Sequence, residues 1–126
     1  MRLVDTSAWI EWFLGSPASR QLEPLMPVPE EWIVPTIVQL ELAKWLMREA
    51  NEDELDKVLA FSQMCVVAPL NSEIAVRAAE CCAQHQLATA DAIIYATALV
   101  RGADVLTCDA HFRDLSGVTY VPKGGA

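Results

Sequence analysis

The chain has 126 residues, 53% of them hydrophobic, and its 17 acidic residues outnumber its 9 basic residues, which gives a net charge of -8. No apolar run approaches the ~18 residues that a membrane span needs, and the N-terminus lacks the basic and apolar segments of a secretory signal. We therefore expect one compact cytoplasmic domain over residues 1–126, without the broad positive surface that non-specific nucleic-acid binding needs.

Short apolar strands and helices alternate from the start of the chain. Residues 3–4 predict a strand that meets Asp5, and the apolar and aromatic residues 7–14 predict a helix. Ser16-Pro17 has the residue types of an N-cap and a first helical position, so we expect a second helix to begin there. A short strand is predicted at 32–34, before Pro35.

The middle of the chain predicts a pair of helices that form a hairpin. The first begins at Thr36, and Asn51 with Glu54 three residues later is a variant of the capping box that begins the second. Residues 66–68 predict another short strand. Asn71 then begins a helix that runs to about residue 84.

The last third of the chain repeats the alternation of helix and strand. Thr89 is the expected N-cap of a helix that Gly102 ends, and the strand at 104–107 meets an acid at Asp109. The last strand is predicted at 118–121. Because no strand alternates apolar and polar residues, we expect an α/β fold with a five-stranded parallel sheet and helices on both faces.

Four carboxylates interrupt the local hydrophobic pattern. Asp5 and Asp109 follow apolar strands, and the carboxyl ends of parallel strands meet at the edge of the sheet where such folds bind their ligands. Glu41 and Asp91 lean over apolar faces of their helices. We expect these four side chains to face one crevice.

Each acid also has a simpler explanation when it is considered alone. Asp5 has the residue type of a helix N-cap, and Asp91 in a first helical turn favours the helix dipole. Glu41 has the spacing to pair with Lys44 or Arg48 on the surface. As a set, however, carboxylates that share a crevice need a cation to neutralise them.

The expected cation is a hard divalent ion. No cysteine or histidine joins these acids in a zinc-like pattern, and all-oxygen sites suit Mg²⁺ or Mn²⁺, here as one or two ions. Such ions usually also meet a phosphate. The chemistry that this indicates is metal-assisted phosphodiester hydrolysis, in which a metal activates water and stabilises the leaving oxygen.

Four segments, in chain order, resemble the motifs of PIN-domain ribonucleases, and in particular the toxin subunits of VapBC toxin-antitoxin modules: L-V-D-T-S-A-W, T-I-V-Q-L-E-L-A, T-A-D-A-I-I-Y-A-T-A and V-L-T-C-D-A-H-F. The resemblance covers essentially the whole chain. It implies a three-layer α/β/α sandwich and a Mg²⁺- or Mn²⁺-dependent endoribonuclease. The family's catalytic and metal-binding acids fall on Asp5, Glu41, Asp91 and Asp109.

The resemblance implies further roles and partners. Thr6 or Ser7, together with Thr107, would lie near the acids and orient water or phosphate. His111 stands where many members have a further acid, so phosphate binding, help to a second metal and a plain surface position all stay open. The expected partners are an RNA substrate, a second copy of the chain that packs through the later helices, and a cognate antitoxin. In the family the antitoxin's C-terminal segment lies in a groove between the early helices.

The acidic charge limits how RNA can be held. Two divalent ions would change the net charge from -8 to -8 + 4 = -4, so the contacts with RNA must be local. The candidate basic residues are Lys44, Arg48, Arg77, Arg101 and Arg113.

Two other functions stay open. One is an aspartyl-phosphate protein, either a receiver domain or a phosphatase with Asp5 as its nucleophile, although V-V-A-P-L-N lacks the receiver's acid and Ser7 replaces the phosphatase's second Asp. The other is a catalytically silent PIN-like binding module. Because all four acids are present, the function that we expect is a metal-dependent endoribonuclease toxin that an antitoxin neutralises.

Overall fold

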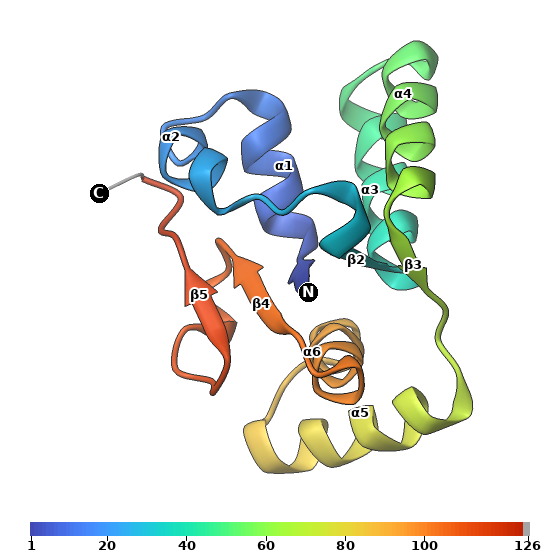
Figure 1. Cartoon of the computed structure of the whole chain (residues 1–126), viewed down its shortest axis with the longest axis vertical. Coiled ribbons are helices and arrows are strands. Elements are labelled where there is room, and N and C mark those ends of the chain that lie inside the picture. The colour runs from blue at the N-terminus through green and yellow to red at the C-terminus, as the bar shows by residue number, and fades with distance from the viewer. Residues whose placement is uncertain (125–126) are drawn as a thin grey trace.

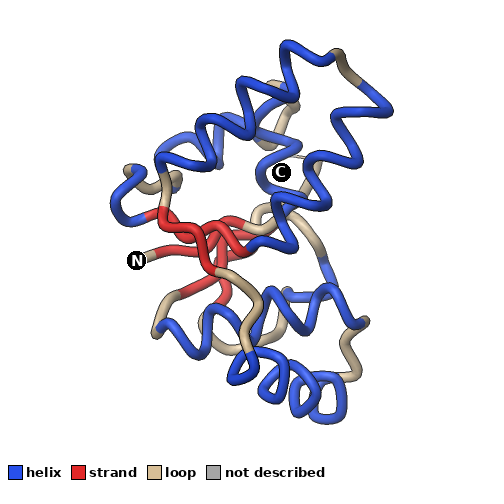
Figure 2. The backbone as a smooth tube through the Cα atoms, turned by 90° about the vertical axis from the view of Figure 1, so that its right-hand side faces the viewer, coloured by secondary structure: helices blue, strands red, loops and turns tan. Residues whose placement is uncertain are grey.

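The computed structural model describes residues 1–124. Its centre is a sheet of five strands, all parallel, with the order β3-β2-β1-β4-β5. The strands are β1 (Arg2–Val4), β2 (Trp32–Pro35), β3 (Val66–Ala68), β4 (Asp104–Thr107) and β5 (Val118–Tyr120). Helices lie on both sides of the sheet (Figure 2), so the predicted fold class is confirmed.

The helices form two layers. They are α1 (Thr6–Leu14), α2 (Ser19–Leu22), α3 (Thr36–Glu49), α4 (Glu52–Met64), α5 (Ser72–His85) and α6 (Thr89–Arg101). Short 3-10 helices lie at η1 (Glu23–Leu25), η2 (Pro29–Glu31) and η3 (Ala110–Phe112). Figure 1 shows α1 to α4 on one side of the sheet, with α3 and α4 as the predicted hairpin, and α5 and α6 on the other side.

Helix caps explain several of the element boundaries. The side-chain oxygen of Asn51 accepts a 2.9 Å hydrogen bond from the Glu54 N–H, and Asn71 caps α5 in the same way. Gly15 and Gly102 end α1 and α6 at φ values of 62° and 66°, a left-handed conformation that glycine adopts without strain. These caps confirm the boundaries that the sequence predicted there.

One predicted N-cap and one predicted helix start were wrong, although α6 does begin at Thr89 as expected. The N-cap of α6 is Ala88, so Thr89 is already helical and its hydroxyl does not cap the helix. Helix α2 begins at Ser19, because Ser16 and Pro17 form a turn in which the Ser16 carbonyl accepts hydrogen bonds from the Ser19 N–H and hydroxyl. The residue types were correct for a cap, but the turn moves the first helical residue from Pro17 to Ser19.

The core is built around the central strand. Leu3 and Val4 of β1 are fully buried, and all four residues of β2 are buried beside them. Trp9 of α1 packs on Trp32 of β2 with ring centroids 4.6 Å apart, and Phe61 of α4 completes the aromatic cluster. Burying each large apolar side chain contributes ~1.5–3 kcal/mol, so this cluster anchors the helical layer on the sheet.

The parallel topology brings distant residues to one edge of the sheet. Asp5 directly follows β1, Asp109 comes two residues after β4, and Lys123 comes three residues after β5. Helix α3 begins directly after β2, so Glu41 lies in its second turn above the same edge. Within residues 1–124, the structure contains no helix with the length and apolarity to cross a membrane.

Candidate functional site

Asp5 is a buried carboxylate at the junction of β1 and α1. Its side chain is 2% exposed and accepts hydrogen bonds from two neutral donors, the backbone N–H of Ser7 and the hydroxyl of Thr107. Burial raises the pKa of Asp5 to about 6, although the hydrogen bonds from Thr107 and Ser7 oppose this rise. Asp5 is therefore the N-cap of α1, and one of its oxygens is also tied to β4.

Hydroxyl groups hold this junction in place. Thr107 is fully buried beneath Asp5, and its oxygen accepts a 2.9 Å hydrogen bond from the N–H of Asp109. The Ser7 hydroxyl accepts a 3.0 Å hydrogen bond from the N–H of Cys108 and lies 3.3 Å from the Thr107 hydroxyl. The start of α1 and the end of β4 are thereby fixed relative to each other.

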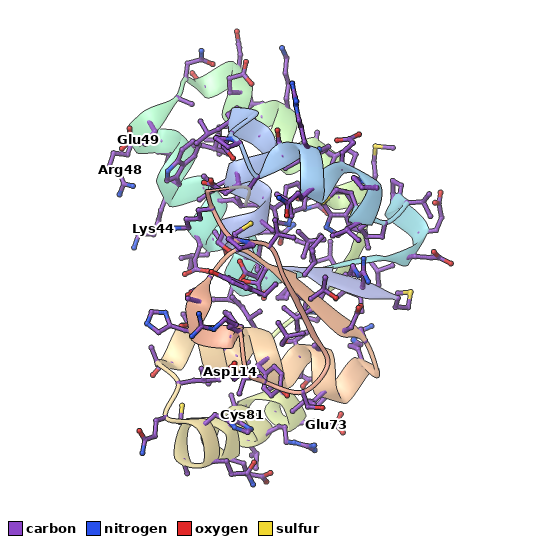
Figure 3. The ribbon with its side chains drawn as sticks, turned by 90° about the vertical axis from the view of Figure 1, so that its left-hand side faces the viewer. Lys44, Arg48, Glu49, Glu73, Cys81 and Asp114 are labelled. Atoms are coloured by element: carbon purple, nitrogen blue, oxygen red, sulfur yellow. The ribbon has the colours of Figure 1, made fainter. Side chains whose placement is uncertain are left out.

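Glu41 points back toward α1. Its Oε1 accepts a 2.7 Å hydrogen bond from the hydroxyl of Thr6. The surface pairing that its spacing allowed is not what the structure shows, since Arg48 pairs with the neighbouring Glu49 at 2.9 Å. Figure 3 shows Lys44, Arg48 and Glu49 projecting outward from α3.

Asp91, Asp109 and His111 form a second group of close side chains. One ligand atom from each lies within 4.8 Å of the others, which is the spacing of groups that can share a metal ion. Asp109 Oδ1 accepts a 2.9 Å hydrogen bond from the His111 N–H and lies 2.8 Å from His111 Nδ1. Burial raises the pKa of Asp91, and the negative charges of Asp109 and Glu41 add to this effect while His111 opposes it.

One cavity of about 240 Å³ joins the carboxylates of the site, and His111 is not among its lining residues. The four acids predicted from the sequence all line it, together with Thr6 and Ser7. Thr107 is not among the lining residues, because it lies behind Asp5. The convergence that the sequence predicted for the four carboxylates is present in the structure.

Two further charged residues line the same cavity, and the sequence argument missed both. Glu11 lies one turn after Ser7 on the face of α1 that meets the site, a spacing that was visible in the sequence. Lys123 follows the last strand, so the rule that located Asp5 and Asp109 also applied to it.

The donor set fits a hard divalent cation. Five carboxylates line the cavity, and the most buried of them, Asp5, is hydrogen-bonded only to the neutral groups of Ser7 and Thr107 among the residues that the structure describes. Carboxylate oxygens suit Mg²⁺ and Mn²⁺, and a single imidazole from His111 is also compatible with Mn²⁺. Such an ion would offset the mutual repulsion of these acids.

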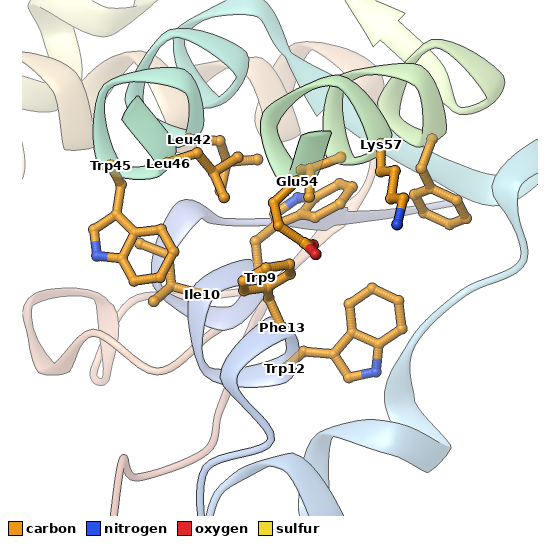
Figure 4. Close-up of a pocket in the computed structure, with 11 residues that line it drawn as sticks. Trp9, Ile10, Trp12, Phe13, Leu42, Trp45, Leu46, Glu54 and Lys57 are labelled. Atoms are coloured by element: carbon orange, nitrogen blue, oxygen red, sulfur yellow. The ribbon is translucent and has the colours of Figure 1, made fainter. Parts of the chain in front are cut away.

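A second cavity, of about 210 Å³, is apolar and lies between α1, α3 and α4. Figure 4 shows Trp9, Ile10, Trp12 and Phe13 of α1 facing Leu42, Trp45 and Leu46 of α3, with Glu54 and Lys57 of α4 at its margin. We call this cavity the aromatic groove. Trp9 is buried, Trp12 and Trp45 are half-buried and Phe13 is 38% exposed.

Comparison with known proteins agrees with this architecture. The family profile described as the PIN domain matches residues 2–118. Similar solved structures include a toxin-antitoxin complex from Klebsiella pneumoniae, with a TM-score of 0.81 and 21% identity over 94% of this chain and 96% of that chain. A search of curated protein sequences finds no match.

Two more structures are similar at comparable identity. VapC20 of Mycobacterium tuberculosis, described as a Sarcin-Ricin loop cleaving toxin, has a TM-score of 0.75 and 20% identity over 94% of this chain and 97% of that chain. DNA-bound VapBC of Salmonella typhimurium has a TM-score of 0.75 and 19% identity over 97% of both chains. At these identities the likeness is one of fold, while the family profile spans nearly the whole sequence: the chain belongs to the PIN domain family.

Proposed function

We propose that this protein is a metal-dependent endoribonuclease that hydrolyses phosphodiester bonds of RNA. The observation that carries the proposal is the convergence of Asp5, Glu41, Asp91 and Asp109 on one cavity at the carboxyl edge of a parallel sheet. Membership of the PIN domain family and the likeness to a structure described as a Sarcin-Ricin loop cleaving toxin support this proposal.

In this proposal Asp5, Asp91 and Asp109, with Glu41, hold one or two Mg²⁺ or Mn²⁺ ions. Bound there, the metal would supply an activated water and neutralise negative charge on the reacting phosphate. Thr107 keeps Asp5 in its orientation, and Thr6 does the same for Glu41. The exposed part of Ser7 lies at the cavity, where its hydroxyl can contact water or phosphate.

The activity test uses purified protein without any antitoxin. With Mn²⁺ or Mg²⁺ it should cleave RNA from a total cellular pool, and EDTA should stop the reaction. Asp91→Asn should abolish cleavage and leave the circular dichroism spectrum unchanged. Asp114→Asn is the matched control, because Asp114 is an exposed acid that does not line the cavity. If the wild-type protein with either metal cleaves no RNA, the nuclease proposal fails.

We also propose that a cognate antitoxin neutralises the enzyme by placing an amphipathic segment in the aromatic groove. The groove is apolar, and it shares Ile10 of α1 with the acidic cavity, so a segment seated there lies next to the carboxylates. A positively charged side chain of that segment would be attracted to them. Similar structures solved as toxin-antitoxin complexes support this partner.

Two observations test the antitoxin proposal: the neighbouring gene and the effect of a substitution in the aromatic groove. A small neighbouring gene for a DNA-binding protein is expected, and its product should co-purify with the chain and inhibit RNA cleavage. Trp45→Ala should weaken that complex at least tenfold, whereas Met47→Ala, on the same helix but outside the groove, should not. Co-purification that is insensitive to Trp45→Ala would contradict the groove as the binding site.

A homodimer is proposed through α5 and α6, the layer opposite the aromatic groove. Val76 of α5 is 64% exposed and Leu99 of α6 is 38% exposed, and such side chains are more often covered in assemblies. Light scattering after gel filtration should give twice the chain mass of 13.9 kDa. Val76→Asp should convert the dimer to a monomer if this face forms the contact.

The receiver-domain alternative does not agree with the topology. Flavodoxin-like receiver folds have the strand order 2-1-3-4-5, whereas this sheet has the order 3-2-1-4-5. Asp5 is also nearly inaccessible, at 2% exposure, which is unfavourable for a nucleophile that must reach a phosphoryl donor. Incubation with acetyl phosphate should leave Asp5 unmodified, as mass spectrometry would show.

A further inference from the structure

Lys123 places a positive charge at the carboxylate cavity. It follows β5, whose partner strand β4 is adjacent to β1, so the carboxyl ends of all three strands meet at one edge. Lys123 lines the cavity together with Asp5, Asp91 and Asp109. Its position is therefore set by the topology of the sheet, as the positions of the acids are.

Lys123 is also the one basic residue among those that line this cavity. Four other basic side chains in the described part of the chain are in ion pairs elsewhere: Arg2 with Asp104, Arg48 with Glu49, Arg77 with Glu80 and Arg113 with Asp114. Because Lys123 lines the same cavity as the acids, its ammonium group can act on a ligand that binds there.

The electrostatic field at this cavity is unfavourable for a phosphate. Five carboxylates line the cavity and the whole chain carries a charge of -8, so a phosphodiester is repelled both locally and at long range. Two divalent ions balance only four of the five carboxylate charges. A further positive charge at the cavity would reduce this repulsion.

We infer that Lys123 binds a non-bridging oxygen of the RNA phosphate at the mouth of the carboxylate cavity. This inference rests on the proposed nuclease function and assigns one of the substrate contacts of that same site. A lysine suits the task, because its compact ammonium on a flexible stem binds phosphate as a point charge without a fixed geometry. The contact is independent of base identity.

Removing the charge of Lys123 should change metal binding and RNA binding in opposite directions. Lys123 repels a divalent cation in the same cavity, so replacing it with a neutral residue should strengthen metal binding in the absence of RNA. The same replacement removes a phosphate contact, so it should weaken RNA binding. A misfolded variant would bind both metal and RNA more weakly. Tighter metal binding together with weaker RNA binding therefore distinguishes the role of Lys123 from damage to the fold.

The experiment compares the full-length wild-type protein with Lys123→Ala, Lys123→Arg and Lys57→Ala. The last is the matched control, because it removes the same charge from α4, outside the acidic cavity. Calorimetric titration with Mn²⁺ alone measures metal binding. Fluorescence anisotropy measures the binding of two short single-stranded RNAs of different sequence, with Ca²⁺ in place of Mn²⁺ and a gel to show that the RNA stays intact.

For Lys123→Ala we expect Mn²⁺ binding to become about two- to fivefold tighter and RNA binding about fivefold weaker, equally for both sequences. The slope of log affinity against log salt should fall by about 0.7, the value for one phosphate contact on a single strand. Lys123→Arg should keep both affinities close to wild type, and Lys57→Ala should change neither by more than about 1.5-fold.

Three results would overturn the inference. Unchanged RNA affinity in Lys123→Ala, while the wild-type protein binds RNA, refutes the contact and leaves the nuclease proposal intact. Unchanged Mn²⁺ affinity shows that the ammonium group does not act on the cavity. A wild-type protein that binds no RNA at all overturns the nuclease proposal as well, so the two failures are distinguishable.

Discussion

The hydroxyl of Thr6 donates a 2.7 Å hydrogen bond to Glu41 Oε1 and so joins the first residue of α1 to the second turn of α3. Thr6 is also the chain neighbour of Asp5, whose side chain is held by Ser7 and Thr107. Two carboxylates that are 36 positions apart in the numbering are thereby held in a fixed relation before any ligand binds. Such pre-organisation reduces the reorganisation that metal and substrate binding would otherwise require.

Replacing Thr6 tests this relation. Thr6→Val keeps the shape of the side chain but removes the donor, so Glu41 is free to turn away from the cavity. We expect kcat for RNA cleavage to fall about tenfold, which corresponds to the ~1.4 kcal/mol that one hydrogen bond typically contributes. Thr6→Ser keeps the donor and should retain most of the activity. A normal kcat in Thr6→Val would mean that Glu41 needs no positioning by α1.

The buried carboxylate of Asp5 makes the stability of the metal-free protein depend on pH. Its pKa in the folded state is about 6, above its ordinary value of 3.8, so the folded state binds the proton more tightly than the unfolded state. The unfolding free energy therefore falls as pH rises from about 4 to about 6, and the loss persists above pH 6. A shift of this size corresponds to about 3 kcal/mol.

Asp5→Asn isolates this contribution from those of the other acids. An Asn oxygen can still accept the hydrogen bond from the Ser7 N–H, and its amide can donate to Thr107. In EDTA we expect the variant to be more stable than wild type by about 1–3 kcal/mol at pH 7.5 and equally stable at pH 4, measured by urea unfolding. Mn²⁺ should raise the melting temperature of the wild type more than that of the variant. Equal stabilities at pH 7.5 would contradict the cost assigned to burying this charge.

The fold could be predicted from the sequence because its signals are local and agree with one another. Each strand is a short apolar run, and Asn51, Asn71 and Gly102 mark helix ends with a known physical mechanism. The start of α2 could not be predicted in this way. Ser16 has the residue type of a cap, but the turn that includes Pro17 orders the backbone so that the helix begins only at Ser19.

The acids of the candidate site could be predicted because they lie at strand ends or interrupt the apolar faces of helices. Asp5, Glu41, Asp91 and Asp109 each break a pattern, and a parallel sheet brings them together. Hydrogen-bond partners depend on side-chain directions in three dimensions, so the role of Thr6 toward Glu41 could not be read from spacing. Glu11 was missed, although it is the one charged residue of α1 and lies one turn after Ser7.

Two aromatic residues of α1 should respond differently to truncation. Trp9 is 2% exposed and packs on Trp32, so Trp9→Ala should destabilise the fold by about 3–5 kcal/mol. Phe13 is 38% exposed, and its ring centroid lies 6.0 Å from that of Trp45 across the aromatic groove. Phe13→Ala should therefore lower the free energy of unfolding by only about 0.5–1.5 kcal/mol. Urea unfolding at one pH compares the two directly. Equal losses would show that Phe13 belongs to the core rather than to an accessible groove.

His111 should set which divalent ion the site prefers. Its Nδ1 lies 2.8 Å from Asp109 Oδ1, close to the ~3.0 Å that separates two ligand atoms bound at right angles ~2.1 Å from one metal. Imidazole binds Mn²⁺ more readily than Mg²⁺, which takes oxygen ligands almost exclusively.

His111→Ala should therefore weaken Mn²⁺ binding about tenfold and Mg²⁺ binding only slightly, a difference that calorimetric titration of each metal would measure. His111→Asp should reverse the preference by supplying an oxygen ligand in place of the nitrogen. His85→Ala is the control, because it removes the chain's other histidine, which lies against Tyr95 and is not part of the cluster of Asp91, Asp109 and His111. Equal weakening of both metals in His111→Ala would mean that the imidazole orients Asp109 through its hydrogen bond and does not itself bind the ion.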